Sequence, residues 1–79
     1  MSRWKRPLKA AEVRKILKAL GFELRPQKST GHEQWVKEAP SFKKVTLSAH
    51  NEPFDDFIVA SMARQAGVSV RDFYAALDR

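Results

Sequence analysis

One of the chain's two histidines lies in a short polar segment that could move protons. His32 directly follows Gly31, and Trp35 comes three residues later. The hydroxyl side chains of Ser29 and Thr30 precede the glycine. Imidazole is the side chain best suited to proton transfer near neutral pH. The chain also has 15 Lys and Arg against 9 Asp and Glu, a formal charge of +6, and a basic surface attracts polyanions. Together these features indicate chemistry on RNA.

Cleaving RNA without a metal ion needs a base for the 2′-hydroxyl, an acid for the 5′-oxygen and compensation of charge on the phosphorus. A positioned acid or base contributes roughly 100- to 10,000-fold. By residue type His32 could be the general base or acid and His50 the complementary group, although a lone histidine is more often structural than catalytic. The candidate RNA contacts lie in or beside the same segment: Arg25, Lys28, Ser29, Thr30, Gly31 and Gln34. Arg25 and Lys28 could hold phosphate oxygens, and the N–H of Gly31 could approach a phosphate closely.

Composition excludes several other kinds of functional site. The chain has no cysteine, which excludes disulfides, thiolate metal sites and cysteine nucleophiles. Two histidines far apart in sequence make a poor zinc set, so we expect no metal and no cofactor. No apolar run approaches the ~20 residues that cross a bilayer, which favours a cytoplasmic protein. With 79 residues, the core is too small to enclose a deep pocket, so the site should be an open surface.

Periodicity predicts the elements that must position these residues. Apolar residues at helical spacing predict a helix over 8–20 that ends at Gly21. Alternation predicts strands over 22–25, 32–37 and 44–49, joined by short turns into an antiparallel sheet. A second helix should run from Phe54 to Gly67, with Phe57 among its core residues. Ser69 is typical of an N-cap, with Asp72 three residues later, and a short last helix follows.

Side-chain parity then predicts where the histidines lie. Helices can cover only one face of so small a sheet, which leaves the other face open. If Trp35 is the core residue of the middle strand, His32 and Gln34 face outward. Val36 has the opposite parity and competes with Trp35 for the core, although the bulk of Trp35 favours the first arrangement. By the same parity, His50 should lie on the open face.

Four motifs in this order resemble those of the HicA toxins, small ribonucleases of toxin–antitoxin pairs. They are Leu-Gly-Phe at 20–22, Gly-His at 31–32 with Trp35, Val-Thr-Leu-Ser-Ala-His at 45–50, and Gln-Ala-Gly-Val-Ser at 65–69. The family usually has a serine between the glycine and the histidine, whereas here Gly31 precedes His32 directly. Its second helix often carries an arginine where this chain has Ala60.

The sequence itself indicates a single domain over residues 8–79 behind a basic tail at 1–7, and the resemblance covers that domain from about Leu8 to Leu77. The resemblance implies an α+β fold of order α-β-β-β-α, like a double-stranded-RNA-binding domain, with a short extra C-terminal helix and the helices on one face of a three-stranded antiparallel sheet. It further implies metal-independent cleavage of mRNA, with His32 in the position of the family's catalytic histidine, and a HicB-type antitoxin as partner.

Two other classes of function remain open at this level. A non-catalytic RNA-binding module would hold RNA by its shape and phosphates, and replacing His32 would alter binding only modestly. A protein-interaction domain would use its basic surface on an acidic partner and would not retain RNA at moderate salt.

Overall fold

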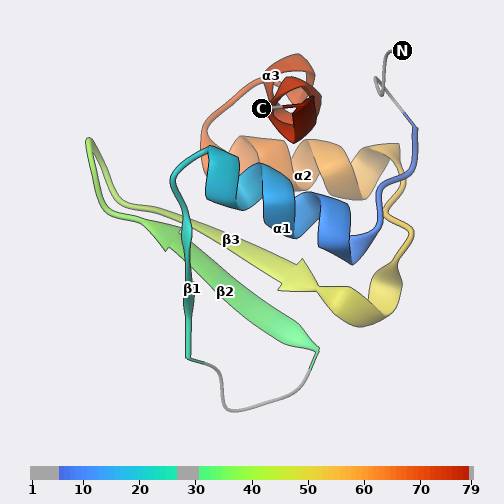
Figure 1. The fold of residues 1–79 in the computed structure, drawn as a ribbon, viewed down its shortest axis with the longest axis horizontal. Coiled ribbons are helices and arrows are strands. Elements are labelled where there is room, and N and C mark those ends of the chain that lie inside the picture. The colour runs from blue at the N-terminus through green and yellow to red at the C-terminus, as the bar shows by residue number, and fades with distance from the viewer. Residues whose placement is uncertain (1–5, 27–30, 79) are drawn as a thin grey trace.

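The elements of the chain follow its hydropathy pattern (Figure 1). The computed structural model describes residues 6–26 and 31–78. The helices are α1 (Ala10–Ala19), α2 (Asp56–Ala66) and α3 (Val70–Ala75), the strands are β1 (Glu23–Arg25), β2 (His32–Lys37) and β3 (Lys43–Ser48), and two short 3₁₀ helices are η1 (Ala49–Asn51) and η2 (Ala76–Asp78). The predicted α+β order of helix, three strands and helices is confirmed.

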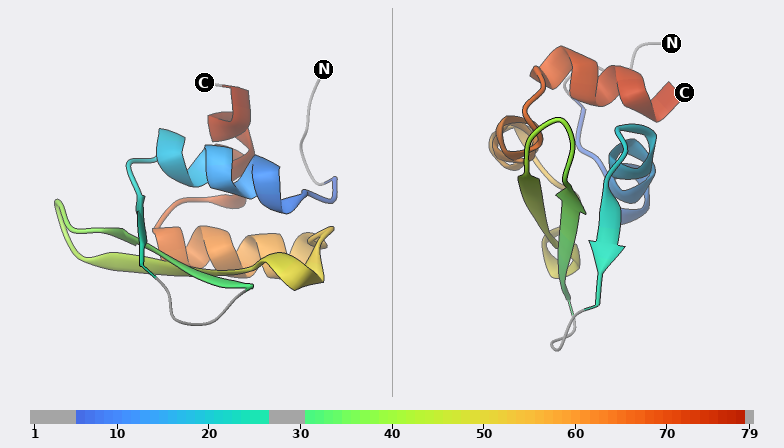
Figure 2. Two further views of the ribbon diagram at one scale, coloured as in Figure 1. Left: turned by 60° about the horizontal axis from the view of Figure 1, so that its bottom comes forward. Right: turned by 90° about the vertical axis from the view of Figure 1, so that its left-hand side faces the viewer.

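The three strands form one antiparallel sheet with β2 in the centre. Both α1 and α2 cover the same face of this sheet (Figure 2). Trp35, Val45 and Leu47 point into the core beneath the helices, as the parity argument predicted for Trp35. Val36 points to the opposite face, yet only 7% of its surface is exposed. We call that opposite side the open face.

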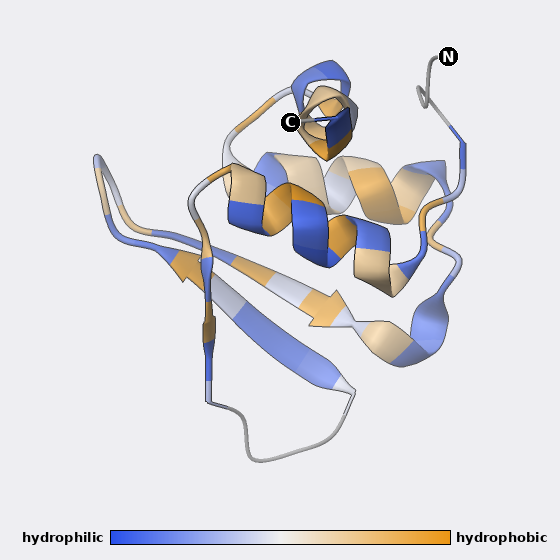
Figure 3. Cartoon of the chain, in the orientation of Figure 1, coloured by the Kyte–Doolittle hydropathy of each residue, from blue (hydrophilic) through white to orange (hydrophobic). Residues whose placement is uncertain are grey.

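The first helix begins at Ala10, two residues later than predicted. The Glu12 carboxylate accepts a hydrogen bond from the Lys9 N–H at 2.9 Å, which closes the first turn. Leu8 instead forms an antiparallel bridge with Phe54, and each backbone N–H donates to the other residue's carbonyl. Apolar and polar residues alternate along α1 (Figure 3), so that one stripe of the helix is buried.

The prediction that Phe57 belongs to the core is wrong, since 87% of its surface is exposed. The second helix begins at Asp56, after Asp55 accepts the Ile58 N–H as N-cap. Its buried face is defined by other residues: Val59, Met62, Ala63 and Ala66. At 100° per residue, Phe57 lies on the opposite side of the helix from these four. Gly67 ends the helix with a positive φ of 79°, as expected.

The last helix forms a third layer on α1 and α2 (Figure 2). The Ser69 hydroxyl accepts the Asp72 N–H at 3.0 Å, which confirms the predicted N-cap. Phe73 and Leu77 are buried in the common core. The Tyr74 hydroxyl donates to the Arg6 carbonyl at 2.6 Å. The C-terminal helix α3 therefore holds the segment before α1 in place through this hydrogen bond.

Candidate functional site

His32 is the first residue of β2, and its side chain is exposed on the open face. Its neighbour across β3 is Ser48. On the other side β1 ends at Arg25, which pairs with Gln34, so His32 extends beyond the end of β1. The imidazole is therefore held by a strand and remains accessible to a large substrate.

His50 lies close to the same end of the sheet, although not for the predicted reason. The third strand ends at Ser48 and not at residue 49, and His50 belongs to η1. The alternation of a strand therefore does not extend to His50. The chain turns because the Ala49 N–H donates to the Gly31 carbonyl at 2.8 Å. This bond brings the exposed His50 ring against Gly31, the residue that precedes His32.

Gly31 is required here for two separate reasons. Its φ is +85°, a conformation that L side chains rarely adopt, and a Cβ at this position would overlap Cδ2 and Nε2 of His50. The sequence predicted that Gly31 allows close approach of a phosphate. In the structure, the group that approaches the glycine is the imidazole of His50. A glycine directly before His32 therefore lets the His50 ring pack against the backbone at the start of β2.

We expect Gly31→Ala to destabilise the protein and to displace His50. Gly21→Ala is the matched control, because Gly21 also has a positive φ of 95° but its added Cβ would meet only Lys37 atoms at 3.4 Å or more. Gly21→Ala therefore measures the backbone strain, which costs of order 1–3 kcal/mol. Gly31→Ala should cost more, and the excess should disappear in the Gly31→Ala/His50→Ala double variant. Urea unfolding of these three variants, of His50→Ala and of the wild type tests this, and equal losses of stability in Gly31→Ala and Gly21→Ala would contradict the contact.

Two further predicted RNA contacts lie on the open face beside His32. Gln34 is flanked by Arg25 on β1 and Thr46 on β3. The Thr46 hydroxyl donates to the Gln34 carboxamide oxygen at 3.1 Å. The Arg25 guanidinium pairs with Glu38 at 2.7 Å, and both side chains are largely exposed. Arg25 must leave this ion pair or share it if it is to hold a phosphate. The remaining predicted contacts, Lys28, Ser29 and Thr30, lie outside the described residues.

A partly buried ion pair beneath β2 was not predicted from the sequence. Two nitrogens of Arg14 donate to the Glu33 carboxylate at 2.6 to 3.1 Å, and the Trp35 indole N–H donates to it at 3.0 Å. The hydrogen bonds from Arg14 hold the pKa of Glu33 below its ordinary value, against the effect of burial. The same bonds raise the pKa of Arg14. Glu33 has the same strand parity as Trp35 and so lies on the core side, and a carboxylate there requires a partner, which was the available signal.

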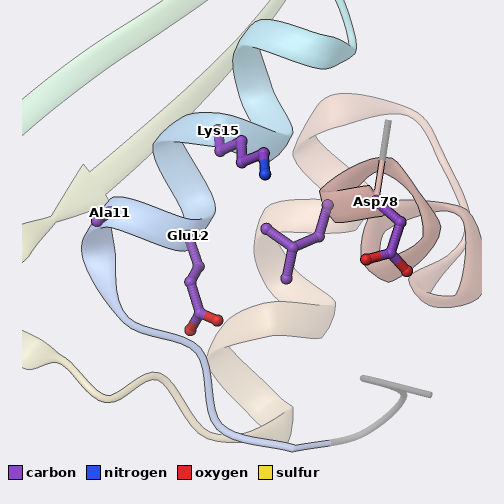
Figure 4. Close-up of a pocket in the computed structure, with 5 residues that line it drawn as sticks. Ala11, Glu12, Lys15 and Asp78 are labelled. Atoms are coloured by element: carbon purple, nitrogen blue, oxygen red, sulfur yellow. The ribbon is translucent and has the colours of Figure 1, made fainter. Parts of the chain in front are cut away.

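A hollow of about 460 Å³ between α1 and η2 lies on the helical layer, away from the open face (Figure 4). It is lined by Ala11, Glu12, Lys15, Leu77 and Asp78. Glu12 and Asp78 carry negative charge there and Lys15 carries positive charge. The Glu12 carboxylate already accepts from the Lys9 N–H and from Arg6. Since this hollow contains no imidazole, it is not the candidate site.

Neither a metal cluster nor a membrane span is found in the part of the chain that the structure describes. Within 6–26 and 31–78, no group of three or more His, Cys, Asp or Glu residues could hold a metal ion. None of the helices in these ranges is long and apolar enough to cross a membrane.

The fold and the site define a small α+β protein with an exposed histidine pair at one end of a sheet that is open on one face. The family model described as HicA toxin of bacterial toxin-antitoxin matches residues 10–68. The chain belongs to this toxin family, and membership implies an antitoxin as partner. No significant match was found among curated proteins or among solved structures. The matched residues include both histidines and end before α3.

Proposed function

We propose that this toxin is an endoribonuclease that cleaves mRNA without a metal ion and that a HicB-type antitoxin neutralises it. The observation that carries the proposal is the contact of His50 with Gly31, directly before His32. Cleavage of a phosphodiester needs a base and an acid in one place, and two exposed imidazoles at the same end of the sheet could supply both. A substrate of mRNA puts the site of action in the cytoplasm.

In the proposed reaction, one imidazole takes the proton of the 2′-hydroxyl as the 2′-oxygen forms its bond to phosphorus. The other imidazole protonates the 5′-oxygen as its bond to phosphorus breaks. The products are a 2′,3′-cyclic phosphate and a 5′-hydroxyl, so atoms and charge balance without a metal or cofactor. His32 is the primary catalytic group and His50 is its complement. The proposed RNA contacts are Arg25, Gln34 and Gly31, together with Lys28, Ser29 and Thr30.

The open face supports a substrate that is a strand and not a small molecule. His32 lies beyond the end of β1, and Arg25, Gln34 and Thr46 form a polar row beside it. The excess of basic residues, with a formal charge of +6, favours the approach of a polyanion over that of an acidic peptide of few charges.

We expect the purified protein to cut a mixed-sequence RNA in the presence of EDTA and to leave 2′,3′-cyclic phosphate ends. Mass spectrometry of the products identifies these ends. Products that end in a 3′-hydroxyl and a 5′-phosphate would exclude the proposed reaction. If the RNA is bound but remains intact, the protein is the non-catalytic RNA-binding module of the same fold.

A further inference from the structure

A second polar feature of the open face lies farther along the same strands. A hollow of about 210 Å³ is lined by Gly21, Glu23, Arg25, Val36, Lys37 and Glu38. Glu23 and Val36 are direct neighbours across β1 and β2, and their side chains point to the same face as His32. Val36 is four residues from His32 along β2, which corresponds to about 13 Å. A strand of RNA cut at His32 would pass over this hollow.

Val36 lies at the floor of the hollow. Its side chain is only 7% exposed and lies outside the cluster that forms the hydrophobic core. The groups that a ligand in the hollow would meet are therefore chiefly the charged side chains around Val36: Glu23, Arg25, Lys37 and Glu38.

The charges around this surface disfavour a phosphate as its occupant. Arg25 is paired with Glu38 at 2.7 Å, and the Lys37 ammonium donates to the Leu20 carbonyl at 2.8 Å. Within the described residues, the Glu23 side chain forms no hydrogen bond or ion pair, so its carboxylate is free to accept. The two carboxylates offset the two cations, so the rim offers no net positive charge to an anion, whereas a nucleobase is neutral and offers donors to the carboxylates.

The hydrogen-bonding edges of nucleobases are complementary to the charged side chains around the hollow. Carboxylates accept hydrogen bonds from the amino groups of bases, and Arg or Lys donates to ring nitrogens and carbonyl oxygens. In single-stranded RNA the bases are splayed out and can be reached in this way. We propose that the hollow formed by Val36, Glu23, Arg25, Lys37 and Glu38 binds one base of a single-stranded RNA and gives the cleavage its sequence preference. This inference rests on the proposed ribonuclease function.

The test is a map of cut sites on a random-sequence single-stranded RNA in the presence of EDTA, read by sequencing the new ends. The wild type should prefer certain bases at one position that is separated from the cut. Glu23→Gln replaces a pure acceptor by an amide that also donates, so the preference at that position should change about 5-fold or more. Preferences at the other positions and the overall cutting rate should change little.

Asp72→Asn on α3 is the matched control, since it removes one negative charge from an exposed residue far from the open face. Glu38→Gln on the opposite rim provides a second variant, and thermal unfolding confirms that each variant is folded. If the map of cut sites is unchanged in both Glu23→Gln and Glu38→Gln, the proposed base-binding subsite is wrong, whereas the ribonuclease proposal stands. A uniform change of rate without a change of preference also overturns the subsite. If the wild type does not cut RNA, the ribonuclease proposal itself fails, and the subsite fails with it.

Discussion

Replacing His32 by alanine is expected to abolish RNA cleavage while the fold is retained. The imidazole is exposed at the start of β2, so its loss should change the free energy of unfolding by no more than about 0.5 kcal/mol. As a general base or acid it contributes roughly 100- to 10,000-fold, and the cleavage rate should fall by this factor. Cleavage of a labelled RNA by wild type and variant under single-turnover conditions measures the loss.

Two further variants separate proton transfer from RNA binding. His32→Gln keeps a polar side chain of similar reach but cannot exchange a proton near neutral pH, so it should be as inactive as the alanine variant. His50→Ala removes the proposed complement and should lower the rate by about 100-fold or more. Binding of an uncut RNA analogue with a 2′-deoxy linkage should be nearly unchanged in all three. Retention of the wild-type rate in His32→Ala would exclude the histidine mechanism.

The fold could be predicted because the signals that define its helices and strands lie in residues close together in sequence. Alternation in residues 32–37 and the size of Trp35 were enough to assign β2 and its buried side, and both are confirmed. Gly67 and Ser69 mark the ends of helices by backbone geometry that neighbouring residues do not override. The exposed position of His32 follows from the same parity. These features depend on hydrophobic periodicity and on capping residues, and both can be recognised from residues that are adjacent in sequence.

The errors concern positions that tertiary contacts decide. Phe57 fits the helical period of α2, but that period does not specify which side of the helix meets α1 and the sheet. His50 lies beyond the last strand residue because the Ala49 N–H pairs with Gly31. That pairing joins residues far apart in sequence, and strand alternation cannot reveal it. The proximity of His50 to His32 was therefore expected from the wrong geometry.

The pairing of Arg14 with Glu33 likewise depends on how α1 crosses the sheet. The periodicity of a helix or strand gives the side on which each residue lies, but only the structure shows that the sides carrying Arg14 and Glu33 meet. The pair lies on the core side of the part of β2 that extends beyond β1. Glu33 directly follows His32 in this strand. It therefore connects the stability of the domain to the position of the candidate catalytic residue.

Removal of the Glu33 carboxylate is expected to be among the most destabilising single changes outside the apolar core. In Glu33→Ala, the Trp35 indole N–H and the Arg14 guanidinium both lose their acceptor. The loss of one partner from a fully buried ion pair costs about 3–5 kcal/mol. Because the Arg14 side chain is 39% exposed and regains water, we expect about 2–3 kcal/mol here. For a domain of this size that lowers the melting temperature by about 10 °C or more.

The exposed pair of Arg25 and Glu38 is the matched control. Its nitrogen–oxygen distance is 2.7 Å, against 2.6 Å for Arg14 and Glu33, but its side chains are 49% and 71% exposed. Glu38→Ala should therefore cost no more than about 1 kcal/mol. Urea unfolding at pH 7 compares the two variants, and equal losses would show that burial of the Glu33 pair contributes nothing to stability.

The pH dependence of stability gives an independent test of the same ion pair. Arg14 holds the pKa of Glu33 below its ordinary value in the folded protein, whereas the unfolded chain should titrate near about 4.3. The unfolded state then binds the proton more readily, so stability from this group is complete above about pH 4.3 and is lost as the pH falls through the folded pKa. Glu33→Gln lacks this titration. The stability gap between wild type and Glu33→Gln should therefore narrow from pH 6 to pH 3, and a constant gap would mean that the charge of Glu33 does not stabilise the fold.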